Sequence, residues 1–103
     1  MAANPERGEV DLVIGDEKGV LCAEMARLAI LSSQIGTRTM RDLFERLQGV
    51  EPFAMYAAID ALLVDGDPKA IKQAMRTPGD LAIVSAAVIK SLGAFVEDSP
   101  KNG

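Results

Sequence analysis

The spacing of the apolar residues changes once along the chain, and this change limits the fold to a strand pair followed by helices. In the first part, Val10, Leu12 and Ile14 occupy every second position, which is the pattern of a half-buried strand. A turn-forming stretch at 15–19 follows, and residues 20–22 can return as a second short strand. Because a lone hairpin is only marginally stable in water, we expect it to pack against the helices.

From Ala23 onward the apolar residues recur every three or four positions, which is the period of an amphipathic helix. These stretches are separated by glycines and prolines, which commonly lie at helix ends. The clearest stretch follows Thr39, which begins a near match to a capping box. The inward face of the first stretch is predicted to hold Met25, Leu28, Ala29, Ser32 and Ile35. The predicted helices span about 23–35, 39–48, 52–65, 68–76 and 80–96.

The chain has 103 residues, which is the usual length of one domain. We predict a mainly α fold, a small bundle of four to five helices with a short N-terminal β-hairpin, over residues 9–96. Residues 1–8 are expected to be a flexible lead without the apolar segment of a signal peptide, and residues 97–103 a flexible tail. The longest apolar stretch, 81–96, is too short and too polar to span a bilayer, so we expect a cytoplasmic protein.

The composition argues against most catalytic chemistry. The chain has no histidine, so it lacks the commonest general base near neutral pH and the commonest zinc ligand. Its one cysteine, Cys22, stands near Glu24, which favours a structural thiol over a nucleophile. The segments 15–19 and 65–67 match neither a phosphate-binding loop nor a calcium loop and are better explained as turns. We therefore expect no catalytic, cofactor-binding or metal-binding residues, and no enzyme activity.

Charge disfavours nucleic acid as a partner, because the net charge is −4 at pH 7 and a duplex binder needs a basic face. One helix face is locally basic, with Arg38, Arg41 and Arg46. This face either contacts an acidic partner or is a solvated surface in which Asp42 pairs with Arg46, four positions away.

The last predicted helix is apolar over more than one face. A seam of residues three or four positions apart, here called the C-terminal seam, consists of Leu81, Val84, Val88, Leu92 and Phe95. Further apolar residues widen it, namely Ile83, Ala87, Ile89 and Val96. Burial in the domain explains most of this width. The remainder is predicted to form a partner surface or a homo-oligomer interface, since single domains rarely expose large apolar patches without use.

The segment 3–12 (Ala-Asn-Pro-Glu-Arg-Gly-Glu-Val-Asp-Leu) resembles the opening of the small tail assembly chaperones of gene transfer agents and related long-tailed phages. In that family the opening leads into a short hairpin, an Ala/Leu-rich helix ending in Gly and a helix of the form Leu-x-x-Arg-Leu. Segments 28–36 and 43–47 are similar to these two helices, and 57–63 is similar to the next one. This sequence departs from the family at its short second strand and at residues 32–33, which are two serines.

The resemblance implies a non-enzymatic protein that binds the tail tape measure protein and the tail tube protein while tails are built. It also implies a location in the cytoplasm of the bacterial host and absence from the mature particle. We expect the contacts to come from the C-terminal seam, with Met40 and Phe44 as second choice. The alternatives are a structural head–tail or tail component of the particle and a small helical regulatory protein.

Overall fold

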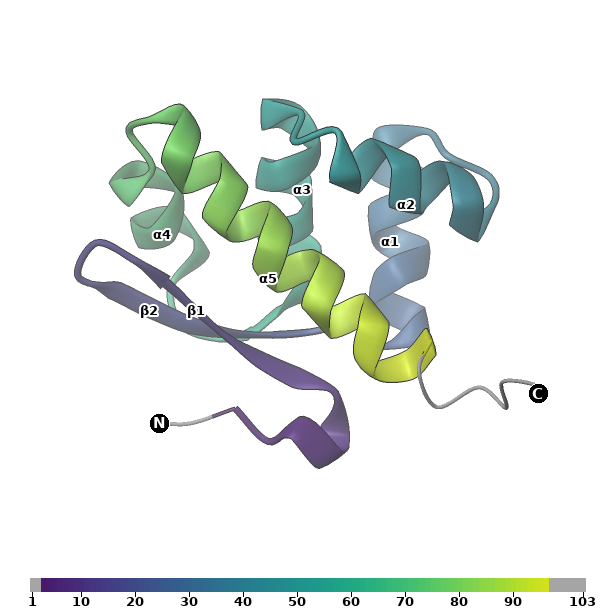
Figure 1. Ribbon diagram of the computed structural model, residues 1–103, viewed down its shortest axis with the longest axis horizontal. Coiled ribbons are helices and arrows are strands. Elements are labelled where there is room, and N and C mark those ends of the chain that lie inside the picture. Colours follow the sequence, from purple (N-terminus) through teal and green to yellow (C-terminus); the bar gives the residue numbers. More distant parts are fainter. Residues whose placement is uncertain (1–2, 97–103) are drawn as a thin grey trace.

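The long C-terminal helix lies across a small antiparallel sheet and also packs against two of the other helices (Figure 1). The computed structural model describes residues 3–96, and the predicted tail at 97–103 lies outside the described residues. A single turn of 3-10 helix, Pro5–Arg7, comes first. The strands are β1 (Glu9–Ile14), β2 (Glu17–Cys22) and β3 (Leu63–Asp65). The helices are α1 (Met25–Ile35), α2 (Met40–Gln48), α3 (Pro52–Leu62), α4 (Pro68–Ala74) and α5 (Pro78–Val96).

The predicted hairpin is present, and its alternation places Val10, Leu12 and Ile14 in the core. Its turn is shorter than the expected stretch at 15–19 and consists of two residues, because Ile14 pairs with Glu17 across the strands. The second strand therefore begins at Glu17 rather than at Val20. Gly15 has φ 58, which suits the first position of a two-residue turn that follows the twist of the strands. The local sequence therefore specifies the turn, and packing against the helices stabilises the hairpin.

The sheet has a third strand that the sequence pattern did not predict. Residues 63–65 were expected to continue the helix from 52, but they form β3 and pair with β2 in antiparallel fashion. The crossing is close: a Cβ on Gly19 would lie 2.7 Å from Leu63 Cδ1 and 2.9 Å from the Asp65 carbonyl oxygen. Leu63 fits a helical spacing as well as a strand, and pairing with the open edge of β2 decides between the two.

The residues before β1 also differ from the expectation of a flexible lead. Within residues 3–8, the backbone N–H of Ala3 donates to Asp11 Oδ1 at 3.1 Å, and that of Asn4 donates to Glu9 Oε1 at 2.9 Å. The 3-10 turn at Pro5–Arg7 therefore lies against the start of β1.

The core forms where α5 packs on β1 and against α2 and α3. Four alanines of α3 (residues 54, 57, 58 and 61) are buried, and their small side chains let α1 and α5 approach this helix closely. The buried hydroxyls are satisfied, because Ser85 Oγ donates to the Leu47 carbonyl at 3.0 Å and Ser91 Oγ donates to the Val88 carbonyl at 2.6 Å. The described residues thus form a mainly helical domain with one N-terminal antiparallel sheet.

Helix α5 begins earlier than expected, at Pro78 rather than near Asp80. The side chain of Asp80 accepts hydrogen bonds from the backbone N–H groups of Arg76 at 2.8 Å and Thr77 at 3.1 Å. In return, the Asp80 N–H donates to Thr77 Oγ1 at 3.4 Å. This reciprocal arrangement is a capping box, and it starts the helix at the proline that the sequence pattern assigned to a break.

Candidate partner-binding groove

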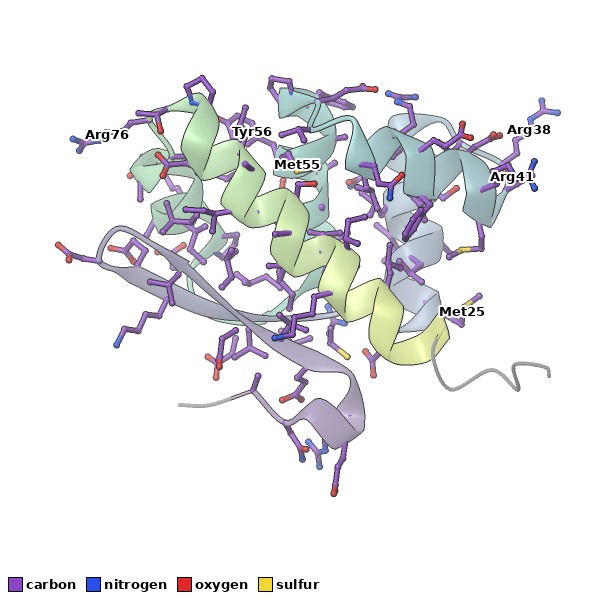
Figure 2. All side chains as sticks on the ribbon, in the orientation of Figure 1. Met25, Arg38, Arg41, Met55, Tyr56 and Arg76 are labelled. Carbon is purple, nitrogen blue, oxygen red and sulfur yellow. The ribbon has the colours of Figure 1, made fainter. Side chains whose placement is uncertain are left out.

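An apolar groove lies at the corner where α1 turns into α2, with a volume of about 430 Å³. Its apolar lining comes from both helices, and the connecting residues 37–39 close one side. Figure 2 shows Met25, Arg38 and Arg41 at this same end of the molecule. The lining residues with apolar side chains are Met25, Leu28, Ala29, Met40 and Leu43. We call this feature the α1–α2 groove.

Local sequence signals position the groove. Helix α1 ends at Gly36, whose φ of 78 is left-handed, and α2 begins after Thr39, whose side chain accepts from the Asp42 N–H at 3.0 Å. Between them, the Ser32 hydroxyl donates to the Thr37 carbonyl oxygen at 2.7 Å. The cap predicted at Thr39 is confirmed, and these contacts hold the corner in a defined shape.

The two methionines at the edges of the α1–α2 groove each occupy the first residue of a helix. Met25 begins α1 and is 73% exposed, while Met40 begins α2 and is 47% exposed. Leu28 and Leu43 are buried and form the floor between them. Flexible thioether side chains above a fixed aliphatic floor suit a surface that adapts to an apolar partner.

Three residues of the C-terminal seam, our first choice for partner contact, lie in the core. Val84 and Val88 are 0% exposed and Leu92 is 2% exposed, so these residues cannot meet a partner while the domain is folded. Leu81 is half-buried and packs against the core, and the side chain of Phe95 lies outside the described residues. The helix is apolar on more than one side because α5 contacts β1 as well as α2 and α3.

Of the second-choice residues, Met40 lines the groove, whereas Phe44 is half-buried and packs against the core. The sequence pattern placed Met25 on the inward face of α1, and this was wrong. The residues of α1 that are buried are Leu28, Leu31 and Ile35. Met25 continues their spacing, but at the first turn of the helix it extends past the end of the core. The sequence signal that could have indicated the exposure of Met25 was its position at the start of a helix.

The arginines of the basic face differ in their contacts, because Arg46 binds other groups of the domain whereas Arg38 and Arg41 are exposed. Arg46 Nε lies 2.8 Å from Glu51 Oε2, and Arg46 Nη1 donates to the Ile35 carbonyl at 3.2 Å. The pair expected between Asp42 and Arg46 is therefore replaced by a contact that ties α2 to α1. Arg38 and Arg41 are exposed, and within the described part of the chain neither forms an ion pair.

Two other hollows are lined in part by Arg76, which Figure 2 labels. The smaller, of about 250 Å³, lies between Tyr56 and the α4–α5 connection. The larger, of about 620 Å³, lies at the hairpin turn and has both acidic and basic groups on its walls. Across residues 3–96, no three His, Cys, Asp or Glu side chains are grouped in a way that could hold a metal ion. Neither hollow therefore offers a defined chemistry.

Cys22 is buried, and its thiol donates to the Arg7 carbonyl oxygen at 3.4 Å. Burial raises the pKa of the Cys22 thiol, and the carboxylates of Glu24 and Glu9 raise this pKa further. A raised pKa lowers the thiolate fraction, so the environment opposes nucleophilic use of this residue.

Among the helices of residues 3–96, none has the length and apolar character needed to cross a bilayer.

Comparison with protein-family models, with curated proteins and with solved structures gives no significant match to this chain. Membership of the family that segment 3–12 resembles therefore stays a prediction. The α1–α2 groove is the surface feature from which a function can be argued, because it combines apolar lining, exposed methionines and free arginines.

Proposed function

We propose that this protein is a non-enzymatic tail assembly chaperone of a gene transfer agent or a related long-tailed phage, and that it binds the tape measure protein through the α1–α2 groove. The observation that carries the binding mode is the pair Met25 and Met40, which stand exposed on either side of an aliphatic floor. The family assignment is supported by the resemblance of segment 3–12.

The physical reason lies in the nature of the client. A tape measure protein is long and helical, and its apolar seams need cover until the tail tube surrounds them. A groove between two helices accepts one apolar helix face through residues spaced three and four apart. Methionine side chains adjust to clients of different shape, so one small domain can bind many positions along such a client.

In this proposal the protein also helps to recruit tail tube subunits, acts in the cytoplasm of the bacterial host and leaves before the particle is complete. The buried residues of the C-terminal seam, Val84, Val88 and Leu92, hold α5 in the core, where this helix contacts α2 and supports the groove. The proposal therefore moves the predicted contact from the last helix to the corner of the first two.

The test is co-expression of the full chain with the tape measure protein, followed by co-purification. The double variant Met25→Gln/Met40→Gln removes the apolar rims of the groove and keeps side-chain length. Ile30→Gln is the matched control, because Ile30 is 52% exposed on the same helix but does not line the groove. We expect wild type and Ile30→Gln to retain the client and the double variant to lose it.

Two results would contradict the proposal. The first is no complex with wild-type protein. The second is the protein in purified particles at the same ratio to tube protein as in lysate, measured by mass spectrometry. That second result would favour the structural tail component instead.

A further inference from the structure

Two free cations stand at one end of the α1–α2 groove. Arg38 belongs to the connection between the helices and lines the groove, while Arg41 lies in the first turn of α2. Both are exposed, and Figure 2 shows them projecting from the end of the molecule that also carries Met25. Because Arg38 lines the groove together with both methionines, a partner in the groove would contact this guanidinium group.

The two arginines differ from the cations that the fold uses internally. Three ion pairs join Arg27 to Glu24, Arg46 to Glu51 and Lys72 to Asp60, at 3.0, 2.8 and 2.7 Å. Within residues 3–96, neither Arg38 nor Arg41 takes part in an ion pair or a side-chain hydrogen bond. Their guanidinium groups are therefore available to a partner at the groove.

The acids of α2 do not form ion pairs with them. Within residues 3–96, neither Asp42 nor Glu45 lies within ion-pair distance of Arg38 or Arg41. Both arginines are exposed and can therefore meet a carboxylate of a partner. Arginine is well suited to carboxylates, because its planar group can donate two parallel hydrogen bonds to one of them.

We infer that the α1–α2 groove takes an amphipathic helix whose apolar stripe is followed at one end by carboxylates, which pair with Arg38 and Arg41. This inference rests on the proposed function and deepens it by naming the chemistry of the client segment. The apolar stripe supplies the contact with Met25, Met40 and the floor, and the carboxylates add charge-assisted hydrogen bonds to the two arginines.

The experiment uses the full chain and two fluorescent helical peptides of about 20 residues, long enough to cross the groove. Both carry the same Leu/Ala/Met stripe. One has a pair of Glu residues at each end, and the other has Gln at those positions. Binding is followed by fluorescence anisotropy at about 50 mM and about 300 mM NaCl, since exposed ion pairs are screened by salt.

We expect the Glu peptide to bind about fivefold tighter than the Gln peptide at low salt, as two exposed ion pairs allow, and the difference to shrink at high salt. Arg38→Gln/Arg41→Gln should abolish the preference. Lys69→Gln/Lys90→Gln is the matched control, because it removes the same charge from exposed positions outside the groove and should preserve the preference.

Equal binding of the two peptides to wild-type protein, or a Glu preference that survives in the arginine variant, would overturn the inference and leave the proposed function standing. Failure of both peptides to bind would also overturn it. The co-purification with the tape measure protein decides the proposed function separately, so the two failures are distinguishable.

Discussion

Removing the apolar rims of the α1–α2 groove should weaken client binding strongly and leave the fold intact. Burying a whole methionine side chain contributes about 1.5–3 kcal/mol. Met25 has 73% of its surface available and Met40 has 47%. Scaling the contribution by these fractions gives roughly 2–3.5 kcal/mol for the pair. The double variant Met25→Gln/Met40→Gln should therefore raise the Kd about 30- to 400-fold.

The assay is titration of a labelled apolar segment of the tape measure protein with each purified variant, alongside urea unfolding. Glutamine has nearly the same helix propensity as methionine, and the substituted side chains extend into solvent. The unfolding midpoint should therefore stay close to that of wild type. Ile30→Gln should change neither quantity by much. If the double variant is folded and binds with unchanged affinity, or if Ile30→Gln weakens binding equally, the groove is not the contact surface.

Three further predictions concern the fold that supports the groove. Val88→Ala should lower the free energy of unfolding, measured by urea titration, by about 2 kcal/mol, because it opens a cavity at a fully buried site. A cost near zero would contradict the placement of this residue in the core. Gly19→Ala should lower the free energy of unfolding by about 1–3 kcal/mol, because its Cβ would lie 2.9 Å from the Asp65 carbonyl oxygen. Unchanged stability would argue against this close approach of β2 and β3. The backbone hydrogen bonds from Arg76 and Thr77 lower the pKa of Asp80 in the folded protein. The ionised carboxylate therefore stabilises the fold at any pH above the ordinary aspartate pKa of 3.8, and this stabilisation is lost as the pH falls through the lower pKa of the folded state. Asp80→Asn should accordingly make the acid limb of the stability profile shallower, and an unchanged limb in a pH series of thermal melts would refute this role.

Some elements follow from the sequence because their signals are local. The hairpin depends on alternation over six residues and a glycine at the turn, all within one short segment. Helix ends are local in the same sense: Gly36 ends α1, Thr39 caps α2, and Asp67 accepts from the Lys69 N–H at the start of α4. Each of these signals acts within a few residues of the structure that it forms.

The candidate site was less predictable, because apolar spacing does not say which side of a helix another element will cover. Met25 and Leu28 share the same spacing, yet the first is exposed and the second is buried. The sequence pattern gave Met40 as a second-choice contact residue, and this residue lines the groove, whereas Met25, which also lines it, was assigned to the core. The burial of Val88 was equally hidden, since only the contact of α5 with β1 and α3 removes that face from solvent.

The sequence alone determined that this chain is a short hairpin followed by amphipathic helices, because hydrophobic period and capping residues act over a few neighbouring positions. Tertiary structure decided the third strand, the burial of α5, the pairing of Arg46 with Glu51, and the opening left between α1 and α2. These features depend on segments far apart in the chain, and the free energy of their packing is set by shape and distance rather than by local pattern.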